Sequence, residues 1–569
     1  MQLQNIIFPA ESFGYKEMYF RGGELKNNTL ALKKGEQISF DTYFNSFSFT
    51  KYLDYTKAKN ATFVSDFKGK ATVQLCVYDG EKHVVSEISA ENKVEVFIDF
   101  SNLPEKGFLY PVFIAETDCI ISDFRYESDC IPRKINACVG ICTYKREQYV
   151  KKNINAMRSF KFSFINRVFV SDNGNTLDYN ALSDNFINIC PNKNYGGSGG
   201  FTRCLIEAYD NDFSHIILMD DDVEFHCESL ERMTTFISIL RDECSENWFS
   251  AGMFPMDKPW NQFELGAEWD GKKAIVHKHN LDMLSLDNIL DNLDNSCIGY
   301  GGWWTLCMPV SVVEKGLPYP FFIKFDDVEY GMRKSPEVDI ITMNGVSVRH
   351  EAFDKKTSFV LDYYNLRNEL VVNTIYGKYG VSGVIRRYWY EVCKQLFLYR
   401  YDNIPIVIRA IKDYLSGAEF FFRCDDEKVN SELINSVPKM HQLENLPGWE
   451  EGMRNDNHIK NKNVSVGMIM SLGGHLIPSF LLKKDITAYP LSRISAKDTY
   501  LKKTVIQYQL GGNTGIATNR SFGKFMKYLF KSMLILPQIL FRYKKCKTNL
   551  MNQKHILVSM EFWRKKLGI

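Results

Sequence analysis

An alternation of strand-like and helix-like segments begins near Asn136, and it constrains the fold more than any other feature of the chain. Four apolar runs typical of buried strands are separated by helix-like stretches: NACVGICTY, RVFVSDNG, FINICPNKN and HIILMDDDVEF. Such alternation predicts a mainly parallel sheet covered by helices. Each strand ends in a polar cluster, namely Thr143–Arg146, Ser171–Asn173, Asn192–Asn194 and Asp220–Asp222. Because ligands of such sheets bind at the carboxyl ends of the strands, we predict one site along this edge.

Two regions of different character flank this segment, as expected for a chain of 569 residues, which is too long for one core. Residues 1 to about 130 hold short strand-like runs between turn residues, which indicates an antiparallel sandwich. Its aromatic cluster would form core or a face for stacking on carbohydrate, and core is the favoured interpretation. The cluster comprises Phe40, Tyr43, Phe44, Phe47 and Phe49. Beyond about residue 380 the runs are long and helix-like. We predict a β-sandwich domain over 1–132, an α/β domain over 133–380 and a mainly helical region over 381–569.

Three consecutive acids, Asp220, Asp221 and Asp222, follow the apolar run Ile216–Met219. Side chains of an extended strand alternate between its faces, so Asp220 and Asp222 are predicted to point the same way and Asp221 elsewhere. Two carboxylates on one side suit a hard cation such as Mg²⁺ or Mn²⁺ that also binds phosphate oxygens. A solvated acidic turn is the alternative, but the position directly after a buried strand favours a metal site.

A glycine-rich stretch lies between the third strand and the acidic run. It reads Asn194-Tyr195-Gly196-Gly197-Ser198-Gly199-Gly200, with four glycines in five positions. Glycines let the backbone approach a ligand closely and supply N–H groups to it. The stretch is neither a P-loop nor a GxGxxG motif. By itself it could be a flexible turn; its place before the acids favours a bed for a nucleotide sugar.

Three further motifs follow the acidic run. Trp303 and Trp304, preceded by two glycines, would stack on sugar rings or lie in the core. The run Phe322–Glu329 contains the acids Asp326, Asp327 and Glu329; a general base for an acceptor hydroxyl and a surface salt-bridge cluster explain them equally well. His350 closes an apolar alternation, where a structural role is usual, yet a neutral imidazole there could be a third metal ligand.

Taken in order, these motifs resemble glycosyltransferases of family 2 with the GT-A fold, specifically the polymerising galactofuranosyltransferases of bacterial cell-wall galactan. The matching segments are Thr143–Arg146, Ser171–Gly174, Asn194 with its glycines, Asp220–Asp222, Trp303–Trp304, Phe322–Gly331 and His350. The likeness extends to Phe40–Asn45 in the N-terminal region and to Tyr364–Asn368 after the catalytic core. It covers most of the chain, although the length and the two terminal portions depart from the actinobacterial enzymes.

The resemblance implies a role for each matched residue. Residues implied to bind or border the UDP moiety are Arg146, Asp172, Asn194, Gly197 and Asp221. Residues implied to bind Mn²⁺ or Mg²⁺ between the phosphates are Asp220, Asp222 and His350. The base would be Asp327. Residues implied to contact acceptor or donor sugar are Trp303, Trp304, Asp326 and Glu329.

The implied activity is metal-dependent, inverting transfer of galactofuranose from UDP-galactofuranose to a hydroxyl of a growing, lipid-linked cell-surface glycan. Asp327 would deprotonate this hydroxyl while the metal and nearby cations stabilise charge on the UDP leaving group. One alternative is a family 2 enzyme that uses UDP-galactose or dTDP-rhamnose. Another is a non-catalytic carbohydrate-binding protein. The fold alone would not choose among them.

The net charge of +2 conceals a basic tail. From Arg520 onward, nine Lys and three Arg face one acid, Glu561, so the tail carries +11 and the first 519 residues carry −9. The run Phe522–Tyr543 places Lys524, Lys527 and Lys531 at helical spacing among apolar residues, which indicates a helix at a membrane interface kinked at Pro537. An ordinary packing helix is the alternative.

No signal peptide, spanning run or nucleic-acid motif is evident in the sequence. The fourteen cysteines include no CxxC pair, and buried free thiols in a reducing compartment are the favoured interpretation. We therefore expect a cytoplasmic protein, peripheral on the inner face of the plasma membrane, that binds no nucleic acid. Whether it forms a homo-oligomer is left open.

Overall fold

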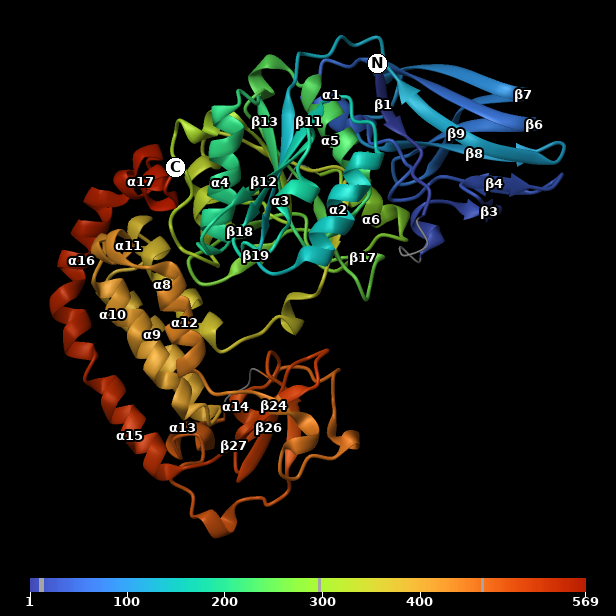
Figure 1. Cartoon of the computed structure of the whole chain (residues 1–569). Coiled ribbons are helices and arrows are strands. Elements are labelled where there is room, and N and C mark those ends of the chain that lie inside the picture. Colours follow the sequence, from blue (N-terminus) through green and yellow to red (C-terminus); the bar gives the residue numbers. More distant parts are fainter. Residues whose placement is uncertain (10–14, 295–297, 462–464) are drawn as a thin grey trace. The chain divides into compact units, whose positions relative to one another are not determined.

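The computed structural model describes residues 1–9, 15–294, 298–461 and 465–569 (Figure 1). They form two compact units. The first unit comprises residues 1–318 and 327–350 with the last residue, and the second comprises 319–326 and 351–568. The predicted boundary at 132/133 therefore falls inside the first unit, and the boundary at 380/381 falls inside the second.

The N-terminal region is a nine-stranded antiparallel sheet. Its strands are β1 (Gln2–Asn5), β2 (Arg21–Gly22), β3 (Glu24–Lys26), β4 (Thr29–Leu32), β5 (Gln37–Ser39), β6 (Asn60–Tyr78), β7 (Lys82–Asp99), β8 (Phe108–Ala115) and β9 (Cys119–Glu127). Strand β6 pairs with β7 along one edge; along the other it pairs first with β9 and then with β8. The sheet thus divides into two leaves, and Phe40 contacts both Phe113 of β8 and Phe124 of β9.

The aromatic residues of this region are core. Phe40, Tyr43, Phe47 and Phe49 have no exposed surface, and Phe44 is only 3% exposed. Phe47 stacks between Tyr52 and Tyr126, with ring centroids 4.7 and 4.4 Å apart. The favoured interpretation is confirmed, and these five rings form no carbohydrate-stacking surface.

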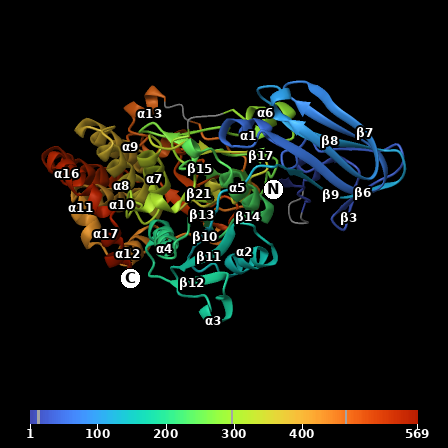
Figure 2. The same ribbon diagram turned by 90° about the horizontal axis from the view of Figure 1, so that it is seen from above.

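A seven-stranded α/β sheet follows, in the order β12-β11-β10-β13-β21-β15-β22 (Figure 2). The strands are β10 (Ala137–Thr143), β11 (Ile165–Asp172), β12 (Ile187–Pro191), β13 (His215–Asp220), β15 (Trp248–Ser250), β21 (Thr305–Pro309) and β22 (Ile340–Ile341). The first four in spatial order are mutually parallel, as predicted. Thr143 pairs with Asp172 and Cys142 with Asp220, so the polar clusters after these strands share one edge.

Helices α2 (Glu147–Ser159), α4 (Gly196–Asp210) and α5 (Cys227–Ser238) alternate with these strands. Close packing of α4 on the sheet depends on glycines. A Cβ atom at Gly200 would lie 2.1 Å from the Cys142 sulfur, and one at Gly140 would lie 2.7 Å from Cβ of Cys204. The mixed α/β fold with an N-terminal sheet and C-terminal helices agrees with the prediction.

The second unit is mainly helical. Its larger helices are α8 (Val360–Ile375), α9 (Val381–Phe397), α10 (Ile404–Leu415), α11 (Ala418–Arg423), α12 (Asp426–Ser436), α15 (Phe522–Met533), α16 (Leu536–Leu557) and α17 (Met560–Leu567). It also holds a sheet that the sequence did not predict: β24 (His441–Gln442), β27 (Thr514–Asn519), β26 (Thr504–Tyr508) and β25 (Thr487–Pro490) in spatial order. These strands are short and distant in sequence. Across the described ranges, no helix is both long and apolar enough to span a bilayer.

Candidate active site

The pairing of two short strands brings His350 to the acidic run. Strand β14 (Glu224–Phe225) begins two residues after Asp222 and pairs antiparallel with β23 (Ser347–His350). Glu224 faces Arg349 in this pairing, which places His350 beside the residues just before β14. Strand β16 (Gly252–Pro255) supports β23 from the other side. The end of β23 is thereby fixed next to the end of β13.

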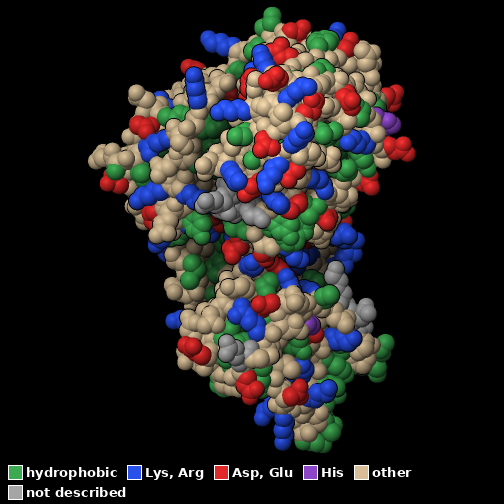
Figure 3. All heavy atoms as spheres, turned by 90° about the vertical axis from the view of Figure 1, so that its right-hand side faces the viewer, with side chains coloured by type: hydrophobic (Ala, Val, Ile, Leu, Met, Phe, Trp, Pro, Cys, Tyr) green, Lys and Arg blue, Asp and Glu red, His purple; other side chains and the backbone are tan. Residues whose placement is uncertain are grey.

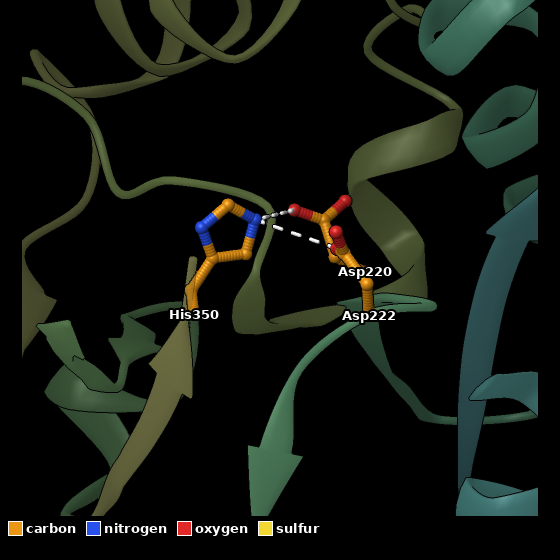
Figure 4. A group of neighbouring side chains, drawn as sticks. All are labelled: Asp220, Asp222 and His350. Atoms are coloured by element: carbon orange, nitrogen blue, oxygen red, sulfur yellow. Dashed lines mark ion pairs between the residues drawn. The ribbon is translucent and has the colours of Figure 1, made fainter. Parts of the chain in front are cut away.

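Asp220, Asp222 and His350 form a cluster of ligand-type atoms (Figure 4). His350 Nε2 lies 3.4 Å from Asp222 Oδ1 and 3.8 Å from Asp220 Oδ2. One potential ligand atom from each residue lies within 4.8 Å of the others, a spacing that a single ion could bridge. The Asp220 side chain is 35% exposed, whereas those of Asp222 and His350 are nearly buried. Two carboxylates and an imidazole suit an Mn²⁺-type ion, and the open side leaves room for phosphate oxygens.

Asp221 points away from this cluster, as the alternation of the run predicts. Its carboxylate accepts hydrogen bonds from Thr143 Oγ1 at 2.7 Å and Arg146 Nη1 at 3.1 Å. Asn153 Nδ2 donates to the Asp221 carbonyl at 2.9 Å. Burial raises the pKa of Asp221, an effect that Arg146 opposes. Asp221 thus ties the end of β13 to the end of β10, and its implied substrate contact stays a prediction.

Arg146 pairs with Asp221 and also with Asp222, which belongs to the cluster with His350. Its Nη1 lies 2.7 Å from Asp222 Oδ2 as well as 3.1 Å from Asp221 Oδ1. The side chain remains 41% exposed, so part of the guanidinium faces solvent at the edge of the sheet. A guanidinium there suits a diphosphate, as the resemblance implied.

The loops after β11 and β12 are held by their own polar side chains. The carboxylate of Asp172 is fully buried and accepts backbone N–H groups of Gly174, Thr176 and Leu177 at 2.8–3.0 Å. Asn194 Oδ1 accepts the Gly196 N–H at 3.1 Å. These bonds shape the edge of the predicted site; direct contact of Asp172 or Asn194 with a nucleotide stays a prediction.

The glycine-rich stretch is not a loop. Helix α4 begins at Gly196, so Gly197 and the remaining glycines lie in its first turns. The flexible turn that the sequence allowed as an alternative is therefore wrong, and the bed for a nucleotide sugar stays a prediction. The glycines permit close packing instead, since Gly200 lies against β10. A helix N-terminus at this edge also carries the positive end of the helix dipole, which suits a phosphate.

Both tryptophans are buried, Trp303 at 5% and Trp304 at 6% exposure. Trp304 Nε1 donates to the Ala251 carbonyl at 3.3 Å. The Trp303 ring meets Phe201 edge-on at 5.3 Å, and its Nε1 has no hydrogen-bond partner in the described part of the chain. This packing agrees with the core interpretation, which the sequence left open. A sugar contact by either ring stays a prediction.

Helix α7 (Asp326–Lys334) carries the second acidic group. Glu329 is buried and accepts Arg333 Nη2 at 3.1 Å, so this acid takes part in a salt bridge. Asp326 is also buried, whereas Asp327 is half-buried. A Cβ atom at Gly331 would lie 2.3 Å from Cβ of Tyr300, which shows how closely α7 packs on that residue. Of the three acids, Asp327 is the most accessible.

Glu264 is a titratable residue near Asp327 that the sequence analysis missed. It is 6% exposed, and its Oε1 has no hydrogen-bond partner among the residues described. Burial, and secondly the charge of Asp327, raise its pKa to about 8. An isolated acid between Phe263 and Leu265 was the available signal in the sequence. Shifted pKa values of this kind are common at functional sites.

The raised pKa of Glu264 predicts a pH-dependent stability. A folded-state pKa near 8, above the ordinary value of 4.5, means that protonated Glu264 stabilises the fold below the lower value. That contribution is lost as the pH rises through 8. We expect Glu264→Gln to become more stable relative to wild type between pH 5 and 8.5, by about 1.4 kcal/mol for each pH unit that lies between the two pKa values. Urea unfolding at both pH values measures this change. Glu314→Gln, at an exposed position, is the control, and equal changes in both variants would contradict the prediction.

Comparison with known proteins identifies similarity in the segment that holds the acidic run. Residues 138–245, which contain β10 to β13 and the acidic run, match the Glycosyl transferase family 2 model. The chain is therefore a glycosyltransferase, and its residues 138–245 are similar to glycosyltransferases of family 2.

Its relatives include two proteins named galactofuranosyltransferase GlfT2. The one from Mycolicibacterium smegmatis is 25% identical, covering 76% of this chain and 72% of the relative. The one from Mycobacterium tuberculosis is 26% identical, covering 76% and 74%. The resemblance drawn from the motifs is thus confirmed. Among solved structures, the mannosyltransferase PcManGT from Pyrobaculum calidifontis, in complex with GDP-Man and Mn²⁺, aligns with a TM-score of 0.30 at 11% identity, over 54% of this chain and 88% of that one.

Proposed function

We propose that this chain transfers galactofuranose from UDP-galactofuranose to a hydroxyl of a growing glycan, with inversion at the anomeric carbon. The observation that carries the proposal is the cluster of Asp220, Asp222 and His350 at the carboxyl edge of the family 2 sheet. The choice of donor is supported by the name that both relatives bear.

The donor half of the site would use the edge formed by β10 to β13. Asp220, Asp222 and His350 would hold Mn²⁺ or Mg²⁺, which neutralises charge on a diphosphate when bound. Arg146, already beside these acids, would pair with a phosphate oxygen. Asn194, Asp172 and the N-terminal turn of α4 at Gly197 would border the nucleotide. Asp221 would keep the acidic run in place through Thr143.

The acceptor half of the site would use α7. Asp327 would take the proton of the acceptor hydroxyl, whose oxygen then attacks the anomeric carbon opposite the departing UDP. Such a single displacement inverts the configuration. Asp326 and Glu329 would border the acceptor, and Trp303 or Trp304 would contact a sugar. Burial of Glu329 and of both rings limits these contacts to small parts of the side chains.

The donor is tested by measuring UDP release with Mn²⁺ and a short galactofuranosyl acceptor. We expect turnover with UDP-galactofuranose at least ten times that with UDP-galactose or dTDP-rhamnose, because misfitting hydroxyl groups leave polar atoms unpaired. Product linkage and length would be read by mass spectrometry and NMR. Faster turnover with either rival donor would overturn the choice of galactofuranose while retaining the transferase.

We further propose that α15 rests on an anionic membrane surface, where a lipid-linked acceptor would be found, on the cytoplasmic face. One helix carries both exposed apolar side chains and exposed lysines. The apolar residues are Phe522, Met526, Phe530 and Met533, and the lysines are Lys524, Lys527 and Lys531. The expected kink at Pro537 is wrong, because α15 ends at Met533 and Pro537 lies in the first turn of α16. On the face drawn in Figure 3, basic and acidic side chains are intermixed.

Charge reversal tests this surface. We expect Lys524→Glu/Lys527→Glu/Lys531→Glu to weaken binding to phosphatidylglycerol vesicles, measured by co-sedimentation, by at least about a hundredfold, since each basic residue contributes about 1 kcal/mol and the new acids are repelled. The matched control is Lys33→Glu/Lys34→Glu/Lys68→Glu, which changes three exposed lysines of the N-terminal region. An equal loss in the control would show that only net charge matters. Unchanged sedimentation of the α15 variant would contradict the proposal.

A further inference from the structure

We propose that Arg367 and Asn368 of α8 are positioning residues, which hold a strained loop in the conformation that aims Asp327. This inference rests on the proposed role of Asp327 as the base. The loop comprises residues 321–325 and leads directly into α7, whose first two residues are Asp326 and Asp327. Neither Arg367 nor Asn368 was assigned a chemical role by the sequence motifs.

The loop adopts an unfavourable backbone conformation. Phe322, Lys324 and Phe325 have φ angles of +73°, +67° and +69°. All three lie in the left-handed region, which residues other than glycine rarely adopt because the Cβ atom clashes with the backbone. Three such residues among four consecutive positions would not persist without support from the surrounding structure.

Asn368 supplies that support through its side-chain amide. Its Nδ2 donates to the carbonyl oxygens of Ile323 at 2.9 Å and Lys324 at 2.8 Å. Asn368 is completely buried, so water cannot replace these bonds. Both N–H groups of the amide are thus directed at two successive carbonyls of the strained loop.

Arg367 fixes the orientation of that amide. Its Nε donates to Asn368 Oδ1 at 2.8 Å, which requires the Asn368 nitrogen to face the loop. Its Nη2 donates to the Phe321 carbonyl at 2.7 Å. The guanidinium lies 4.9–5.4 Å from the centroids of four rings; these belong to Tyr363, Tyr364, Phe420 and Phe421. An arginine held in this way has no freedom to turn away from Asn368.

One face of α8 therefore makes these contacts to the loop. Tyr364 stacks on Phe322, with centroids 5.3 Å apart and planes 20° from parallel. Tyr364, Arg367 and Asn368 stand at positions i, i+3 and i+4, which share a helix face. This spacing explains the segment Tyr364–Asn368 as a clamp on the loop. We call these three residues the α8 clamp.

Loss of the clamp should affect the base and spare the donor site. Asp327 follows the loop in the chain, so a relaxed loop would change the direction of its carboxylate. The proposed metal and phosphate residues lie at or just after the ends of β10, β13 and β23, whose strand pairings include none of the clamp residues. We therefore expect a lower kcat with unchanged binding of UDP.

The first test compares Asn368→Ala with Asn365→Ala. Asn365 lies on the same helix, and its side chain makes no hydrogen bond to any described residue, so it controls for the loss of an asparagine side chain from α8. We expect Asn368→Ala to lower kcat by on the order of 10–100-fold, because small misplacements of a catalytic group cost that much. Mn²⁺-dependent UDP binding by calorimetry should stay within twofold of wild type. Equal kcat in both variants, or loss of UDP binding in Asn368→Ala, would overturn the inference.

A second test asks whether backbone strain is what the clamp opposes. Glycine adopts positive φ without penalty, so Lys324→Gly should make the loop depend less on Asn368. We expect Asn368→Ala to lower kcat several-fold less in the Lys324→Gly background than in wild type. An identical loss in both backgrounds would overturn the role of strain.

Hydrogen exchange separates this inference from the proposed function. Residues 322–327 should exchange faster in Asn368→Ala than in Asn365→Ala, whatever the donor sugar is. A wild-type protein that does not use UDP-galactofuranose would refute the proposed donor, while faster exchange in that loop would still support the clamp. Unchanged exchange would overturn the clamp even if transfer is observed.

Discussion

Asp222→Ala is expected to abolish transfer, with a fall in kcat on the order of 10³-fold or more, as is usual when a group that stabilises leaving-group charge is removed. Asp222 is the member of the cluster closest to His350 and is almost buried. Its loss would leave Asp220 and His350, too few ligands for a tightly held ion. Isothermal titration should show that Mn²⁺ no longer strengthens UDP binding.

Two control variants separate metal binding from other roles of Asp222. Glu224→Ala removes an acid two residues away that pairs with Lys152, and it should keep Mn²⁺-dependent UDP binding. Arg146→Met breaks the ion pair with Asp222 but keeps all three proposed ligands, so Mn²⁺ alone should still bind. If Mn²⁺ strengthens UDP binding by Asp222→Ala as much as it does by wild type, the proposed metal site is contradicted.

Local sequence patterns were sufficient for the framework of the site. Apolar runs that end in polar residues gave the parallel strands, and residue alternation separated Asp221 from its two neighbours. The proximity of His350 could only be a hypothesis, since it depends on the pairing of Glu224 with Arg349 across 125 residues. Such long-range registers leave little trace in a single sequence.

Patterns with two physical explanations were less informative. Glycines serve close packing as well as ligand binding, and Gly200 serves packing against Cys142. The Trp pair likewise proved to be buried. Glu264 and Asn368 escaped notice because their importance lies in burial and in partners far along the chain. The sheet over residues 441–519 was missed because its strands are short and widely separated.

Asp327→Asn is expected to stop turnover while leaving donor binding intact. The amide keeps the shape of the side chain but cannot accept a proton, and loss of a general base costs about 10²–10⁴-fold in kcat. Asp327 is not a member of the cluster of Asp220, Asp222 and His350. Mn²⁺-dependent UDP binding by Asp327→Asn should therefore match that of wild type. Glu337→Gln is the control, because Glu337 lies three residues beyond α7, is exposed and pairs with Lys315.

A second measurement on the same variant does not depend on activity. The negative charge of Asp327 contributes to the raised pKa of Glu264, after burial. Replacing Asp327 by asparagine should therefore lower the pKa of Glu264, although burial will keep it above 4.5. Infrared titration of the carboxyl band would detect this change. Full turnover in Asp327→Asn would exclude it as the base, and an unchanged pKa of Glu264 would show that the two carboxyl groups do not interact.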